Sequence, residues 1–201
     1  MKHPSTRELF EYWNARRGSR PAPERGEIEP GAIRRVLADT FILAVDPPGG
    51  HPFRLAGTRL CAAFGRELKG VPFTELWSAG SQKPIRDIME IVASESLGVI
   101  AGAGTLGGDG AVLKVELIAL PRAQAGRSNA RILGALVPTN TPYWPGVSTL
   151  DRLTLGTIRY LGSEIHPSPA TPVPAGHTAG ARIRGGLVVY DGARSDADVA
   201  H

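Results

Sequence analysis

The chain has 201 residues, 42% of them hydrophobic and 21% charged, a mixture that excludes an intrinsically disordered protein and suits one compact domain with a tail. The net charge is +4, and the basic residues are scattered along the chain with acidic residues beside them. A nucleic-acid-binding protein gathers its basic residues in a stripe, so we expect no nucleic-acid partner. The single cysteine excludes an intramolecular disulfide.

The N-terminal part of the chain predicts two helices. Ser5 and Glu8 have the spacing of a capping box, and the apolar residues behind them repeat at helical spacing, which predicts a helix over residues 5–17. A polar connector rich in Pro and Gly follows, and Pro30 then opens a short second helix. Residues 1–38 therefore form an N-terminal helical extension.

The central part of the chain predicts an α+β domain over residues 39–146. Five runs have the composition of β-strands: 41–46, 52–57, 99–106, 111–120 and 130–138. Between the second and third runs, we expect helices over residues 58–64 and 81–97. This order favours a five-stranded antiparallel sheet with helices on one face.

In the C-terminal part, residues 147–201, the sequence predicts a helix, a linker and a strand. Apolar spacing favours a helix over 148–161, the Pro-rich run 166–180 is typical of a flexible linker, and 182–192 has the composition of one last strand. Because an exposed apolar strand is an aggregation hazard, we expect residues 183–190 to pair with an edge strand of this chain or of a partner.

Several strings of the chain resemble a branch of bacterial PAS-type proteins that was long catalogued as of unknown function. The resemblance is carried by PFRLAG and the GTRLCAAFGRELKGVPFTELW that follows it, by the earlier EYWNARRGSRPAPERGEIEP, and by the late LVVYDGAR. It implies a PAS-like five-stranded sheet in a signalling module that binds a small ligand or a protein partner and often works as a dimer. It identifies neither the ligand nor the partner.

Motifs for catalysis and for cofactors are incomplete. Gly102, Gly104 and Gly107 fit G-x-G-x-x-G, but a helix precedes them and a strand follows, which is the reverse of a dinucleotide site. Arg16 and Arg20 match half of a cyclic-dinucleotide signature whose second half is missing.

The cysteine and the histidines give no stronger signal. Cys61 lacks the neighbours of a flavin-adduct cysteine, and no histidine lies on the long predicted helix, where the PAS resemblance implies that a haem ligand would stand. No Cys/His cluster has metal-ligand spacing, and no set of nucleophile, base and acid is visible. We therefore predict no enzyme activity, no catalytic residues, no cofactor and no metal.

A set of residues between the predicted helices and sheet is the candidate ligand pocket. Apolar stripes of this kind more often fill a core, so a packed core is the main interpretation and a small cavity is the alternative that the PAS resemblance supports. The candidate residues are Arg54, Leu60, Phe64, Arg66, Phe73, Trp77, Ile88 and Val92.

The first predicted helix is the candidate interface. Leu9, Phe10, Tyr12 and Trp13 fall within five positions, and one helix face cannot bury all four, so some aromatic surface is expected to be left for a homodimer. The alternative is that the Pro-rich connector folds back over the second face.

These observations favour a cytoplasmic single-domain PAS sensory or regulatory adaptor. The N-terminus has no apolar leader, and no 18 apolar residues follow one another, so we expect no membrane span. Because little chain follows residue 161, we expect bacterial signal transduction through a protein signalling partner. The alternatives are a small-molecule or cyclic-dinucleotide receptor and, third, an enzyme on a PAS-like scaffold.

Overall fold

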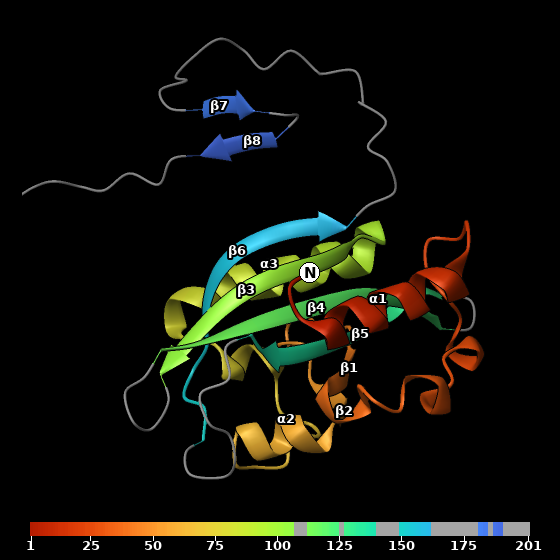
Figure 1. Ribbon diagram of the computed structural model, residues 1–201, viewed down its shortest axis with the longest axis horizontal. Coiled ribbons are helices and arrows are strands. Elements are labelled where there is room, and N and C mark those ends of the chain that lie inside the picture. Colours follow the sequence, from red (N-terminus) through yellow and green to blue (C-terminus); the bar gives the residue numbers. More distant parts are fainter. Residues whose placement is uncertain (107–111, 125–126, 140–148, 162–180, 185–186, 191–201) are drawn as a thin grey trace, which may run out of the picture. The chain divides into compact units, whose positions relative to one another are not determined.

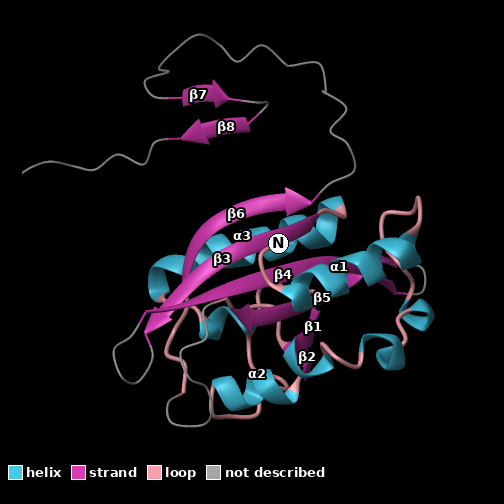
Figure 2. Cartoon of the chain, in the orientation of Figure 1, coloured by secondary structure: helices cyan, strands magenta, loops and turns pink. Residues whose placement is uncertain are grey.

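A six-stranded antiparallel sheet forms the centre of the protein (Figures 1 and 2). The computed structural model describes residues 1–106, 112–124, 127–139, 149–161, 181–184 and 187–190. The strands of the sheet are β1 (Thr40–Ala44), β2 (Phe53–Ala56), β3 (Gly98–Leu106), β4 (Val112–Gln124), β5 (Arg127–Pro138) and β6 (Thr154–Leu161). The helices are α1 (Pro4–Arg17), α2 (Thr58–Ala63) and α3 (Ala79–Glu95), with short 3-10 helices η1 (Arg25–Glu27), η2 (Pro30–Ile33), η3 (Leu37–Asp39) and η4 (Phe73–Leu76).

The strand order of the sheet is β2-β1-β5-β4-β3-β6. The hairpin of β1 and β2 and the meander of β3, β4 and β5 confirm the predicted strand pairs. The N-terminal hairpin joins the meander through β1, which pairs with β5 in antiparallel register. This arrangement leaves β2 and β6 as the two edge strands of the sheet.

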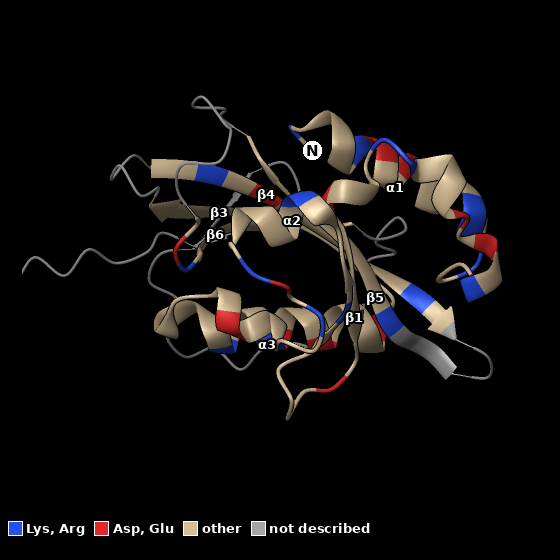
Figure 3. Ribbon diagram, turned by 90° about the horizontal axis from the view of Figure 1, so that it is seen from below, with Lys and Arg blue, Asp and Glu red and all other residues tan. Residues whose placement is uncertain are grey.

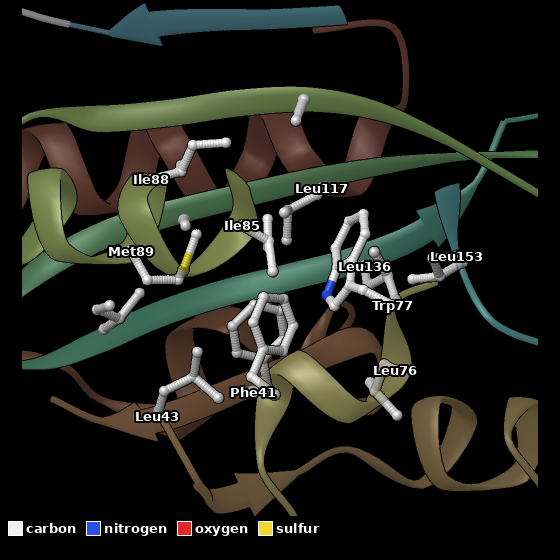
Figure 4. Packing of buried hydrophobic residues seen from close by; sticks show 14 of the residues in the cluster. Phe41, Leu43, Leu76, Trp77, Ile85, Ile88, Met89, Leu117, Leu136 and Leu153 are labelled. Carbon is white, nitrogen blue, oxygen red and sulfur yellow. The ribbon is translucent and has the colours of Figure 1, made fainter. Parts of the chain in front are cut away.

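One face of the sheet is covered by α2, η4 and α3. In α3, Ile85, Ile88, Met89 and Val92 follow the predicted helical spacing, and all four are buried against the sheet. Leu117 of β4 points into the same cluster, as Figure 4 shows. We call this packed layer the helix-side core.

The opposite face of the sheet is covered by α1 and the 3-10 turns that follow it. Leu9 and Trp13 of α1 pack on Ile118 and Leu120 of β4, in a second buried cluster that we call the α1-side core. Residues of β4 therefore alternate between the two cores, because successive side chains of a strand point to opposite faces.

The first helix begins one residue earlier than its capping pattern predicts. His3 is the N-cap residue of α1, and its Nδ1 accepts a hydrogen bond of 3.1 Å from the backbone N–H of Ser5. The predicted second helix from Pro30 is also wrong as a continuous helix, since the structure has the two separate turns η2 and η3 there. Neither change moves the extension away from the sheet.

The predicted helix over residues 148–161 is wrong, because this segment contains β6, the sixth strand. β6 pairs antiparallel with β3, with Gly98 opposite Leu161 and Gly104 opposite Thr154. Thr, Ile and Tyr favour strands, and Gly156 disfavours a helix, so pairing with β3 prevails over the apolar spacing. The sheet has six strands where five were predicted.

The chain divides into two compact units, Met1–Ser163 and Glu164–His201, and the sheet with its helices belongs to the first. In the second unit, the prediction of one last strand is wrong. β7 (Ala181–Arg184) and β8 (Leu187–Tyr190) are two short strands that pair with each other as an antiparallel sheet of their own. The predicted linker 166–180 lies outside the described residues.

Candidate functional site

Six of the eight predicted pocket residues meet in the helix-side core, where α2, η4 and α3 lie over the sheet. The buried members are Leu60, Phe73, Trp77, Ile88 and Val92, and the partly buried Phe64 packs against them. The two arginines of the prediction, Arg54 and Arg66, are exposed instead. Arg66 lies 4.0 Å from a carboxylate oxygen of Glu75, so its charge belongs to the surface of the protein.

Aromatic rings fill the middle of the predicted pocket. The ring centroid of Phe73 lies 5.3 Å from the ring centroid of Phe41, 5.6 Å from that of Phe53 and 5.7 Å from that of Trp77. Such distances are those of rings in direct contact. The arrangement supports the packed-core interpretation for this part of the predicted set.

The indole N–H of Trp77 is the polar feature of this aromatic cluster. Trp77 is fully buried, and its Nε1 has no hydrogen-bond partner. In Figure 4 the nitrogen lies on the side of the indole that faces Phe41. A buried N–H without an acceptor costs desolvation free energy, and a ring face compensates only weakly. This donor could therefore serve an acceptor atom brought by a small ligand.

A buried histidine beside α3 was missed by the sequence interpretation. His51 follows the turn after β1, is fully buried and has a φ of 57°. Its Nδ1 accepts a hydrogen bond of 3.3 Å from the N–H of Asp46, while its Nε2 has no partner. Burial lowers the pKa of His51, and the charges of Glu90 and Asp46 oppose that effect only partly.

The predicted interface residues of α1 are not an exposed aromatic face in this chain. Leu9 and Trp13 are buried in the α1-side core, and Phe10 and Tyr12 are partly buried. The Tyr12 hydroxyl donates to the carbonyl of Glu27 at 3.1 Å and accepts from the N–H of Glu29 at 2.7 Å. The connector thus folds back over the helix, as the alternative interpretation expected, and the homodimer stays a prediction.

Both ends of α1 are fastened to β4. Near its N-terminus, the Glu116 carboxylate accepts hydrogen bonds from the Thr6 hydroxyl and from the N–H groups of Lys2 and His3. Burial alone would raise the pKa of Glu116, but these hydrogen bonds outweigh it and the pKa is lowered. Near its C-terminus, the buried indole N–H of Trp13 donates a hydrogen bond to the carbonyl oxygen of Pro121 in β4.

A surface cleft of about 300 Å³ lies where the C-terminal ends of α1 and α3 meet. Its lining includes Arg17, Arg20 and Glu95. Arg20 donates to Glu27 at 2.7 Å, and this hydrogen bond raises the pKa of Arg20. Arg16, the other arginine of the cyclic-dinucleotide half-signature, lies 3.8 Å from Glu29. The two arginines of that pattern are thus engaged within the protein.

The described residues contain no group of three His, Cys, Asp or Glu side chains that could hold a metal ion. Cys61 is half-buried at the edge of the helix-side core, with its Sγ 3.7 Å from a carboxylate oxygen of Glu67. No helix in the described part of the chain is both long and apolar enough to cross a membrane. Of the G-x-G-x-x-G glycines, Gly102 and Gly104 lie within β3, and Gly107 is outside the described residues.

Comparison with known proteins gives a family match and a likeness to solved structures. The family model described as PAS domain matches residues 1–137, which span α1, the connector and the sheet as far as β5. No curated protein matches the chain. A solved structure titled "Structure of RsLOV D109G" is similar over 53% of this chain and 63% of that chain, so less than two thirds of its length is matched, with 16% identity and a TM-score of 0.38.

Proposed function

Since the chain belongs to the PAS domain family, we propose that it is a sensory or regulatory adaptor that acts by binding a protein partner. PAS domains are sensory modules of signal transduction and are generally not catalytic. Proteins that share this fold have many different roles, so the fold alone does not identify the role of this protein. A particular surface of the protein has to indicate it. The observation that carries the proposal is the exposed edge strand β6.

β6 lies at the end of the sheet and pairs with β3 on one side. Its other edge presents backbone groups that a further strand can pair with. The side chains of Ile158 and Tyr160 remain 42% and 43% exposed. A backbone edge that no other described strand pairs with, together with apolar side chains, is what strand addition by a partner requires. We propose that a partner protein adds an extended segment here.

The two cores offer a route by which a change in one face could reach the other. Leu117 and Ala119 of β4 lie in the helix-side core, whereas Ile118 and Leu120 lie in the α1-side core. A shift of this strand displaces both layers together, because interiors are close-packed. A signal received on the helix side would then change how α1 is held.

The test is site-specific cross-linking of the full chain in cells of its source. A photoreactive residue replaces Tyr160 in one variant and the exposed Glu11 of α1 in the control variant. We expect a discrete cross-linked protein from position 160 and its loss when Ile158→Ser is added. Equal products from both positions, or none from position 160, would argue against β6 as the partner site.

A small-molecule receptor is the second candidate function, favoured by the unpartnered Trp77 N–H in the helix-side core. Native mass spectrometry and an absorption spectrum of the purified protein test it directly. A bound compound that Trp77→Phe removes would support it. The same spectra would also reveal a flavin or haem, which we expect to be absent.

A further inference from the structure

Arginines from several elements converge on the α1-side face of the sheet. Arg122 of β4 and Arg131 of β5 are direct partners in the strand register. Their neighbours Leu120 and Leu133, two positions away in each strand, belong to the α1-side core, so both arginines point to that face. Basic segments lie side by side on β4 and β5 in Figure 3.

Two further arginines complete what we call the arginine row. Arg54 lies at a β-bulge of β2, between Phe53, which pairs with Leu43, and Leu55, which pairs with Ile42, and its charge acts on that of Arg131. Arg25 comes from η1, and the connector is fixed close by, because the N–H of Ala123 donates to the carbonyl of Pro23 at 3.0 Å. The arginine row therefore takes its members from β2, β5 and β4, with β1 between β2 and β5, and from the connector.

The floor of the arginine row is a buried cation. Arg122 is only 7% exposed, and its Nε has no hydrogen-bond partner. Burial lowers the pKa of Arg122, and the positive charges of Arg131 and Arg25 lower it further. The pKa of Arg131 is lowered by burial and then by Arg54 and Arg25. The influences on the pKa of Arg122 include no carboxylate of the described residues.

Such an arrangement is unfavourable without an anion. Like charges directly opposite one another in a sheet destabilise it, and a buried charge without a partner carries a large desolvation cost. Two acidic residues of the adjoining connector are engaged elsewhere, since Glu27 accepts from Arg20 and Glu29 lies 3.8 Å from Arg16. The described residues thus supply the cations of an anion site.

We propose that the arginine row binds a small phosphate-bearing molecule, whose phosphoryl group reaches Arg122 at the floor of the site. Guanidinium groups match the oxygens of a phosphoryl group with two parallel hydrogen bonds. Exposure increases from the buried Arg122 through the partly buried Arg131 to the exposed Arg54 and Arg25. A buried floor of this kind suits one compact anionic group better than a polymer backbone.

The site is distinct from the proposed partner edge, because β3 separates β4 from β6. Binding is tested by calorimetric titration of the full chain with inorganic pyrophosphate and, separately, with inorganic phosphate, at constant ionic strength. We expect Arg122→Met and Arg131→Gln to weaken pyrophosphate binding at least about tenfold, the loss of one good charged contact. Arg34→Gln removes an exposed arginine from the turn after η2 and should leave binding within about twofold.

Thermal unfolding separates a binding role from a structural one. Without anion, Arg122→Met should unfold at a higher temperature than the parent, because it removes the buried like charge. At a hundredfold excess over Kd, pyrophosphate should raise the Tm of the parent by about 5 to 10 °C and leave that of Arg122→Met unchanged. Arg122→Lys keeps the positive charge but loses the two parallel N–H donors of the guanidinium. Pyrophosphate should therefore raise the Tm of this variant, but by less than that of the parent.

Three outcomes would overturn the proposal. Pyrophosphate that binds Arg122→Met as tightly as the parent would place its site elsewhere. Equal weakening by Arg34→Gln would indicate attraction to net charge alone. An Arg122→Met variant that is less stable than the parent without anion would show that Arg122 supports the fold by contacts of its own. Binding of pyrophosphate but not phosphate supports the proposal and favours a polyphosphorylated compound as ligand.

Discussion

The indole Nε1–H of Trp13 donates a buried hydrogen bond of 2.7 Å to the carbonyl oxygen of Pro121. Trp13→Phe keeps an aromatic ring in the α1-side core but leaves this carbonyl without its partner and creates a small cavity. We expect the free energy of unfolding to fall by about 3 kcal/mol. Urea denaturation measures it, with Tyr12→Phe as the control, for which about 1 kcal/mol is expected. Equal losses would show that α1 is held mainly by its connector.

Glu116→Gln should loosen the start of α1. The amide offers fewer acceptor sites to the N–H groups of Lys2 and His3, and we expect a loss of about 2 kcal/mol at pH 7. Because the folded pKa of Glu116 is lowered, its contribution is present above pH 4.5 and is lost as pH falls through the folded pKa. Hydrogen exchange in the first turn of α1 should speed up in the variant at pH 7. Unchanged exchange would contradict the fastening role.

His51 should make the protein less stable in mild acid. Its pKa is lowered in the folded state, so the unfolded chain binds the proton more readily and the free energy of unfolding falls as pH drops below 6.5. The slope is at most about 1.4 kcal/mol per pH unit. His51→Asn suits the positive φ and cannot titrate, so its stability between pH 7 and 5 should be flatter than that of the parent. Parallel curves would assign the acid sensitivity to other groups.

Gly134 should tolerate no side chain. A Cβ on Gly134 would lie 2.3 Å from the ring of Phe41 and 2.5 Å from the carbonyl oxygen of Ile118, and both neighbours belong to packed strands. We expect Gly134→Ala to destabilise the protein by about 3 kcal/mol or more. In the control Gly104→Ala the nearest atom lies 3.9 Å away, so stability should change little. Thermal unfolding of both variants compares them.

The local sequence pattern predicted most helices and strands of the first unit. The wrong predictions lie where contacts with distant parts of the chain determine the secondary structure. The apolar repeat of α3 fixed its buried face, since Ile88 and Val92 needed no knowledge of their partners. β6 was mistaken for a helix because its apolar spacing fits both structures and only the β3 edge discriminates. Its Thr, Ile and Tyr content was the signal that could have indicated a strand.

The candidate sites were harder to predict than the elements. Arg122 and Arg131 are nine positions apart in the chain, and only the register of β4 with β5 sets them opposite each other. His51 looked like a loop residue, but the N–H of Gly49 donates to Asp46 and closes a turn that directs the histidine inward. The connector covers Tyr12 through the backbone carbonyl of Glu27 and the backbone N–H of Glu29. Every residue type has such backbone groups, so the sequence could not indicate this contact.

The pairing of β1 with β5 sets an order of events during synthesis. Thr40 pairs with Ala135 and Ala44 with Arg131, so β1 emerges from the ribosome long before its inner neighbour exists. Until then, the rings of Phe41 and Phe53 lack the central strands that will bury them. The meander of β3, β4 and β5 is made of neighbouring segments and can close first, because short loops cost little entropy. The apolar face of the nascent N-terminal hairpin therefore stays exposed to water until the meander has formed.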